Sequence, residues 1–281
     1  MILDGKVVAA HIKQQLKEEV DDAIKSGLRP PRLVIITVGD DPASEVYVRN
    51  KKKACDEIGI QVEHIVCEAS INSALLKTII AENNFKYDVD GIMVQLPLPK
   101  GFDEREIIDT ISPLKDVDGL TTTNIGRLRS GQPCLRPCTA QGIVDLLDYY
   151  SIPLEGKDAT IVGRSNIVGK PLADLLMQRG MTITQCHSHT ETLIAHTRFA
   201  DILICAIGKP NYIKDYMVNE FATVIDVGIN RNKEGKLCGD VDFEKVSEKC
   251  TNITPVPGGV GPMTVAELMK NTVEAWRKNI Y

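Results

Sequence analysis

The clearest structural signal in the chain is the segment Ala159-Thr160-Ile161-Val162-Gly163-Arg164-Ser165-Asn166-Ile167-Val168-Gly169-Lys170-Pro171. It predicts a buried strand, a turn bounded by glycines and the start of an apolar helix. In such a turn, free main-chain amides and the helix dipole attract a pyrophosphate. Ser165 stands at the second glycine position of the usual G-x-G-x-x-G pattern. Spacing alone therefore leaves two interpretations open, a dinucleotide-binding turn and a plain turn between a strand and a helix.

The strand that follows indicates which dinucleotide would bind. NAD sites usually carry Asp or Glu about 20 residues after the glycine turn, where the carboxylate holds the ribose hydroxyls. No carboxylate lies between Leu175 and Thr190, and the strand ends in Cys186-His187-Ser188. Arg164 and Ser188 offer a guanidinium and a hydroxyl to a 2′-phosphate. The sequence therefore favours NADP over NAD.

Apolar, β-branched runs alternate with amphipathic stretches through most of the chain, which is typical of an α/β protein with parallel sheets. We expect strands at 33–38, 62–67, 91–95, 159–162, 182–186, 202–206 and 223–227. We expect helices at 44–58, 73–83, 140–149, 170–179 and 265–280.

The length of 281 residues suggests two domains, at about 150 residues per domain. Residues 151–158 interrupt the helical periodicity just before a new strand. We therefore expect an N-terminal α/β domain at 1–150 and a Rossmann-like domain at 151–263. Thr264 and Glu267 match a T-x-x-E capping box, which predicts a last helix over 264–281. Periodicity does not show on which domain this helix packs.

Composition and charge exclude several classes of protein. Hydrophobic residues make up 43% and charged residues 25% of the chain, as in ordinary globular proteins. The 33 basic and 38 acidic side chains give a net charge of −5, which argues against nucleic-acid and membrane-surface partners. The first residues show no basic segment followed by an apolar stretch, so we expect a cytoplasmic protein.

The eight cysteines are scattered and form no C-x-x-C pair, so we expect reduced thiols in the core. A zinc site built from Cys134, Cys138, His187 and His189 would match no usual zinc spacing, and we expect no metal.

Tyr47 and Lys51 lie four residues apart in a predicted helix, so their side chains point from one face and share a pocket if that face is covered. The alternative is an exposed helix face, because Arg49, Lys52 and Lys53 surround them. Short-chain dehydrogenases also use a Y-x-x-x-K pair. Their glycine motif lies upstream, however, whereas here it lies more than 100 residues downstream.

Seven motifs in order closely resemble the bifunctional methylenetetrahydrofolate dehydrogenase/cyclohydrolase family. They are Tyr47-x-x-x-Lys51, Gln95-Leu-Pro-Leu-Pro, Lys115-Asp-Val-Asp118-Gly, Arg136-Pro-Cys-Thr-Ala, Gly163-Arg-Ser-Asn-Ile-Val-Gly-Lys-Pro, Asp226-Val-Gly-Ile-Asn and Pro255-Val-Pro-Gly-Gly-Val-Gly-Pro-Met-Thr264. The resemblance extends from about residue 2 to residue 280.

The resemblance implies two domains with an active-site cleft between them, and two successive reactions. NADP-dependent oxidation converts 5,10-methylenetetrahydrofolate to 5,10-methenyltetrahydrofolate, and hydrolysis then gives 10-formyltetrahydrofolate. It also implies a homodimer whose subunits meet through the nucleotide domains, and a last helix that returns to the first domain.

The resemblance also assigns roles to individual residues. Lys51 matches the catalytic lysine, Tyr47 the tyrosine that stacks on folate, Gln95 the partner of the lysine and Asp118 the carboxylate that binds the pterin. The implied substrate contacts are Tyr47, Lys51, Val94, Gln95, Leu96, Asp118, Pro257, Gly258 and Gly259. The implied cofactor contacts are Gly163, Arg164, Ser165, Val168, Gly169, Ser188, Gly208 and Ile229.

The chemistry of the two reactions explains these residue types. Hydride transfer mainly requires that the nicotinamide lie close to the methylene carbon. Hydrolysis requires a base, and a lysine beside a cationic substrate is favoured in its neutral form. Gln95 would hold that amine without adding a negative charge. Two alternatives stay open: a two-domain dehydrogenase of amino or hydroxy acids, and a protein that binds folate or NADP without turnover.

Overall fold

The computed structural model describes residues 1–40, 42–232 and 234–280 of the chain. The chain divides into two compact units. Unit 1 contains Met1–Ala9 and Thr139–Thr264, and unit 2 contains Ala10–Cys138 and Val265–Tyr281. Each unit is an α/β structure built on a parallel sheet, which confirms the predicted fold class. The domain limits drawn from the sequence stay a prediction, because a compact unit is not the same thing as a domain that folds alone.

Unit 2 is built on a three-stranded parallel sheet with the order β2-β1-β3. Its strands are β1 (Arg32–Val38), β2 (Gln61–Cys67) and β3 (Gly91–Val94), and its helices include α2 (Pro42–Ile58), α3 (Ser73–Phe85), α4 (Glu104–Ile108) and α5 (Thr122–Arg129). Successive side chains of a strand point to opposite faces. Leu33 and Ile35 of β1 therefore pack with α2 on one face, while Val34 and Ile36 pack with α3 and α4 on the other.

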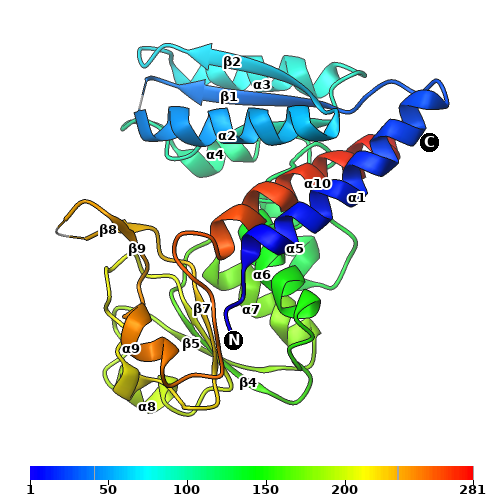
Figure 1. The fold of residues 1–281 in the computed structure, drawn as a ribbon. Helices are drawn as coiled ribbons and strands as arrows, with labels where there is room; N and C mark the ends of the chain where they lie inside the picture. Colours follow the sequence, from blue (N-terminus) through cyan, green and yellow to red (C-terminus); the bar gives the residue numbers. More distant parts are fainter. Residues whose placement is uncertain (41, 233, 281) are drawn as a thin grey trace. The chain divides into compact units, whose positions relative to one another are not determined.

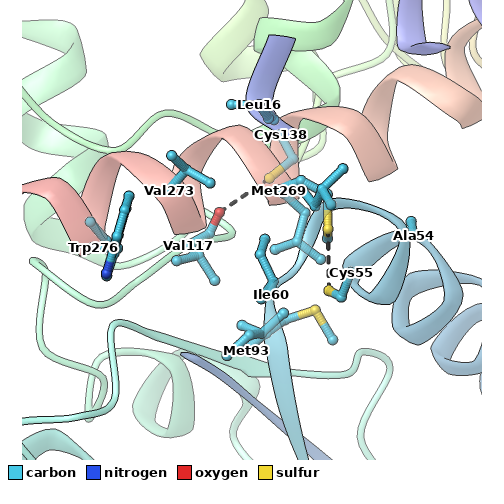
Figure 2. Packing of buried hydrophobic residues seen from close by; sticks show 14 of the residues in the cluster. Leu16, Ala54, Cys55, Ile60, Met93, Val117, Cys138, Met269, Val273 and Trp276 are labelled. Carbon is cyan, nitrogen blue, oxygen red and sulfur yellow. Dashed lines mark hydrogen bonds between the residues drawn. The ribbon is translucent and has the colours of Figure 1, made fainter. Parts of the chain in front are cut away.

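Two long helices, α1 (Gly5–Lys25) and α10 (Val260–Ile280), complete one face of unit 2. Figure 1 shows α10 in red alongside α1 in blue. Leu16 and Val20 of α1 pack in one cluster with Met269 and Val273 of α10. Trp276 is buried in the same cluster, as Figure 2 shows, and its Nε1 donates to the carbonyl of Arg29 at 3.1 Å. Residues 265–280 thus belong to the core of unit 2.

The capping box expected at the start of the last helix is wrong. The helix begins at Val260, directly after Gly258 and Gly259, so Glu267 lies in its third turn rather than its first. Only 1% of Glu267 is exposed, and Lys270 forms an ion pair with it at 3.5 Å. The T-x-x-E pattern is matched by chance within a continuous helix.

Unit 1 is built on a five-stranded parallel sheet with the order β10-β7-β6-β4-β5. Its strands are β4 (Asp158–Val162), β5 (Thr182–Cys186), β6 (Ile202–Cys205), β7 (Thr223–Asp226) and β10 (Asn252–Ile253), with a hairpin of β8 (Asn230–Arg231) and β9 (Leu237–Cys238). Its helices are α6 (Cys138–Tyr149), α7 (Gly169–Gln178), α8 (Leu193–Thr197) and α9 (Phe243–Ser247), with a short 3-10 turn at Asp215–Met217.

The first strand of this sheet, β4, lies between β5 and β6. The chain therefore moves outward in opposite directions from β4, and ligands of such sheets bind beyond the carboxyl ends of the strands at this point. A ligand of this sheet would therefore lie against the loops that follow β4, β5, β6 and β7.

The eight cysteines are free, and six of them are buried, as expected for core residues, whereas Cys134 and Cys238 are only half-buried. The described residues contain no helix that is both long and apolar enough to cross a membrane. Among those same residues, His, Cys, Asp and Glu side chains nowhere gather in a group of three that would hold a metal ion.

Candidate active site

Lys51 is held by the end of the central sheet in unit 2. Its Nζ donates to Oε1 of Gln95 at 3.0 Å and to Sδ of Met93 at 3.1 Å. Gln95 directly follows β3, and its main-chain N donates to the carbonyl of Ile36 at 2.9 Å. Its own Nε2 donates to the carbonyl of Leu96 at 2.7 Å, which leaves Oε1 to face the amine. The lysine is therefore positioned by a neutral partner.

Tyr47 lies one turn before Lys51 on α2, as the spacing predicts. Its ring is 45% exposed, whereas Lys51 is half-buried. An aromatic ring that is open on one face offers a stacking surface. Tyr47 and Lys51 thus combine an apolar surface with a polar group within one helical turn.

A cavity of about 660 Å³ lies beside Gln95 within unit 2. Its described lining contains three cations and three carboxylates: Arg49, Lys52, Lys53, Asp40, Glu45 and Asp56. These charges balance, so the cluster at 49–53 gives this cavity no net attraction for an anionic group.

Asp118 lies in a turn that its neighbour Asp116 holds in place. Asp116 is fully buried and accepts hydrogen bonds from Leu120 N at 3.1 Å, Thr121 N at 2.8 Å and Asn124 Nδ2 at 2.9 Å. Gly119 has φ +70°, and a Cβ there would lie 2.3 Å from the carbonyl carbon of Arg136. This turn fixes the main chain on both sides of Asp118.

Burial raises the pKa of the Asp118 carboxyl, while the charge of Lys51 acts in the opposite direction and that of Asp116 raises the pKa further. Asp118 as a whole residue is half-buried. The charge of Lys51, whose amine is hydrogen-bonded to Gln95, therefore acts on the Asp118 carboxyl within unit 2.

The sequence did not predict that Cys138 and Asn271 support the turn at Asp118. Cys138 Sγ donates to the carbonyl of Val117 at 3.2 Å, the contact drawn as a dashed line in Figure 2. Asn271 of α10 donates from Nδ2 to the same carbonyl at 2.8 Å and to that of Arg136 at 2.9 Å. Both residues thus hold the peptide that precedes Asp118. A buried asparagine among the mainly apolar residues that α10 buries was the signal for this role.

The glycine turn of unit 1 packs closely on its own main chain. Gly163 has φ +135°, and a Cβ there would lie 2.3 Å from the carbonyl oxygen of Ala206. A Cβ at Gly169 would lie 2.3 Å from the carbonyl oxygen of Gly163. Ser165 Oγ accepts from Val168 N at 3.2 Å and Gly169 N at 3.4 Å. The serine therefore pairs two amides at the start of α7, a task that glycine could not perform.

The other predicted cofactor contacts follow the remaining strands of the same sheet. Ser188 comes after β5, Gly208 after β6 and Ile229 after β7. Arg164 and Ser188 are both exposed, at the ends of the paired strands β4 and β5, and Ile229 is 52% exposed. All of these residues lie at the carboxyl edge of the sheet, where the topology places a ligand.

The predicted substrate contacts are divided between the units. Pro257, Gly258 and Gly259 belong to unit 1, where the carbonyl of Gly258 accepts from Gly5 N at 2.9 Å. Val94 and Leu96 flank Gln95 in unit 2. Val94 is 1% exposed and packs in the core, so a ligand would reach only its main chain.

Comparison with known proteins agrees with this arrangement. Residues 3–118 match the tetrahydrofolate dehydrogenase/cyclohydrolase catalytic domain, and residues 137–280 match the NAD(P)-binding domain of the same family. The bifunctional protein FolD of Agathobacter rectalis is 50% identical over 278 residues, covering 99% of each chain.

Solved structures show the same relationship. The bifunctional FolD methylenetetrahydrofolate dehydrogenase/cyclohydrolase from Campylobacter jejuni is 46% identical with a TM-score of 0.97, covering 99% of each chain. The Trypanosoma brucei methylenetetrahydrofolate dehydrogenase-cyclohydrolase, complexed with NADP cofactor and inhibitor, is 34% identical with a TM-score of 0.94, covering 100% of this chain and 98% of that one. The chain is a member of the tetrahydrofolate dehydrogenase/cyclohydrolase family.

Proposed function

We propose that this chain oxidises 5,10-methylenetetrahydrofolate with NADP and hydrolyses the resulting 5,10-methenyltetrahydrofolate to 10-formyltetrahydrofolate. The observation that carries the proposal is the 3.0 Å hydrogen bond between Lys51 Nζ and Gln95 Oε1 on a partly open face. It supports a lysine that is oriented by a neutral amide oxygen and whose charge also acts on the Asp118 carboxyl. A dehydrogenase of amino or hydroxy acids would not require this pair beside Tyr47 and Asp118.

In the proposed complex, Asp118 accepts hydrogen bonds from the pterin and Tyr47 stacks against the ring that follows it. These two contacts place the one-carbon unit beside Lys51, on the same helix as Tyr47. For the oxidation, the task of these residues is orientation, because the folate nitrogen lone pair drives hydride loss. NADP, when bound, supplies the hydride acceptor.

For the hydrolysis, Lys51 takes a proton from water as the water oxygen adds to the methenyl carbon. The proton then passes to the folate nitrogen whose bond to that carbon breaks, and the remaining hydroxyl proton of the adduct leaves to solvent as the formyl C=O forms. A cationic methenyl group favours the neutral amine that this step needs. Gln95 holds the amine in place and adds no charge that would oppose proton release.

The close packing of the turn supports a dinucleotide site. A Cβ at Gly163 or Gly169 would lie 2.3 Å from a main-chain carbonyl oxygen, so only glycine lets α7 begin this close to the end of β4. Gly163, Ser165, Val168 and Gly169 would line the pyrophosphate site. Gly208 and Ile229 would contact the cofactor from the next two loops.

Arg164 and Ser188 would bind the 2′-phosphate of NADP. Their exposure at the ends of adjacent strands supports their role as 2′-phosphate ligands. We also propose a folate domain of residues 1–150 together with the C-terminal residues from 264 onward, and an NADP domain at 151–263. The same proposal includes a cytoplasmic homodimer.

An absorbance assay tests the function directly. Purified protein is mixed with 5,10-methylenetetrahydrofolate and either NADP or NAD, and reduced nicotinamide is followed together with the methenyl band. We expect reduction with NADP, followed by loss of methenyl faster than the uncatalysed rate. Binding of folate without reduction of either cofactor would instead support a binding protein or a cyclohydrolase without dehydrogenase activity.

A further inference from the structure

A fully buried carboxylate, Asp240, lies behind the loops that follow β6 and β7. Its Oδ2 accepts from Ile207 N at 2.7 Å and Gly208 N at 3.1 Å. Its Oδ1 accepts from Lys209 N at 2.8 Å and from Asn230 Nδ2 at 2.9 Å. Three successive amides of one loop and a side chain of the next therefore converge on one carboxylate.

This arrangement requires the ionised form of Asp240. A carboxylate only accepts hydrogen bonds, and both oxygens here face two donors each. A protonated acid or an asparagine amide would place a hydrogen against an N–H group and leave buried donors without acceptors. Bonds to a charged acceptor are also stronger than bonds to a neutral one. The loop at 207–209 is therefore held by charge.

A second buried carboxylate, Asp226, holds Asp240 in turn. It accepts from Gly228 N at 3.0 Å, Asp240 N at 2.9 Å and Val241 N at 2.9 Å. A Cβ at Gly228 would lie 2.4 Å from the Asp240 carboxyl carbon, and a Cβ at Gly239 would lie 1.8 Å from Asp226 Oδ2. The two carboxylates and two glycines thus form one close-packed frame.

We propose that Asp240 is a positioning residue for NADP binding, which acts by holding the loops that carry Gly208 and Ile229. This inference rests on the proposed function and adds a residue that cannot itself touch the cofactor, since none of its surface is exposed. Gly208 donates its own amide to Asp240, and Ile229 lies between Gly228 and Asn230, which both pack on that carboxylate. Asp240 is thus the acceptor for three successive amides of the first loop and for the Asn230 side chain of the second.

The test compares the full-length Asp240→Asn variant with the unchanged protein in two assays and one binding measurement. We expect the Kd and KM for NADP to rise at least about tenfold, a ratio that corresponds to about 1.4 kcal/mol. We expect hydrolysis of methenyltetrahydrofolate, which needs no cofactor, to stay within about twofold. Asp242→Asn is the matched control, because this acid lies two residues later and forms a half-exposed ion pair with Lys214 at 3.0 Å. It should leave the Kd for NADP unchanged.

A second variant, Asn230→Ala, removes only one donor and keeps the test decisive if Asp240→Asn does not fold. It should weaken NADP binding in the same direction by a smaller factor, about threefold. Unchanged Kd for NADP in the folded variants would overturn the inference, and so would equal losses of both activities, which would indicate a general structural role. The Kd is measured by calorimetry without turnover. Failure of the unchanged protein to reduce NADP would therefore refute the proposed function separately.

Discussion

The proposed reactive face of unit 2, formed by Tyr47, Lys51, Gln95 and Asp118, and the loops of unit 1 that follow β6 and β7 are held in opposite ways. Among the described residues, Lys51 donates hydrogen bonds to an amide oxygen and a thioether, and both partners are neutral. The loops after β6 and β7 donate four hydrogen bonds to Asp240 and one, from Gly228 N, to Asp226, and both acceptors are buried carboxyl groups. The group that we propose to exchange a proton thus has neutral partners, whereas the loops that we propose to position NADP are held by acidic side chains.

The strongest test of this comparison removes the amine from the reactive face. Lys51→Met keeps the length of the side chain but has no proton acceptor, so we expect cyclohydrolase kcat to fall by about 100-fold or more. The dehydrogenase should be reduced less, because the lysine only assists that step. The measurement is the decay of the methenyl absorbance.

The matched control for this variant is Lys17→Met, the same substitution at a half-exposed lysine of α1 that forms an ion pair with Asp21. It should leave both activities unchanged. Near-normal hydrolysis by Lys51→Met would contradict both the assignment and the first half of the comparison.

Substitution of Asp118 tests whether this carboxyl group binds the substrate or only stabilises the turn in which it lies. Asp118→Asn keeps the size of the side chain but removes an acceptor, so we expect kcat/KM for methylenetetrahydrofolate to fall roughly tenfold or more. Thermal unfolding should change little, because Asp116 rather than Asp118 holds the turn. Unchanged kcat/KM would make Asp118 a turn residue.

Much of this architecture could be predicted from the sequence. All seven expected strands are present, and their ends differ from the structure by at most one residue. Buried parallel strands are short apolar runs, which composition reveals directly. The helices at 5–25 and 122–129 were missed. The five-residue helices and the two-residue strands were also missed, because they are too short to show a period.

The frame around Asp240 could not be predicted in the same way. The amides that bind its carboxylate lie 31 to 33 residues earlier in the chain. No periodicity connects such distant positions, and a carboxylate near a turn is usually exposed. Tyr47 and Lys51, by contrast, lie within one helical turn, so their proximity follows from helix geometry alone.

A third prediction concerns Arg164, a charged residue of unit 1 that is exposed, in contrast to the buried Asp240. It is exposed beside the glycine turn, so Arg164→Ala should weaken NADP binding by about tenfold more than NAD binding, through loss of contacts to the 2′-phosphate. The measurement is the KM for each cofactor. Arg198→Ala is the control, because this exposed arginine lies over the Phe199 ring at 5.1 Å. Equal losses with NADP and NAD would refute the 2′-phosphate role.

The smallest expected effect concerns the second carboxylate of the frame. Burial raises the pKa of Asp226 from 3.8 to about 6, although three main-chain hydrogen bonds oppose the shift, and the charge of Asp240 adds to it. Between about pH 4 and pH 6 the folded protein therefore binds more protons at this site than the unfolded chain does. The contribution of this carboxyl to the free energy of unfolding accordingly falls as pH rises through that window, and stays constant above it.

Carboxyl 13C NMR of Asp226 measures this titration, with the Asp226→Asn variant to assign the signal. A midpoint near pH 6 would show that the frame contains a carboxyl group that is partly protonated close to neutral pH. A midpoint below pH 4 would show that the three main-chain donors outweigh burial, so that Asp226 accepts their hydrogen bonds as a carboxylate above that pH. The second result would sharpen the contrast with the neutral partners of Lys51, whereas the first would weaken it.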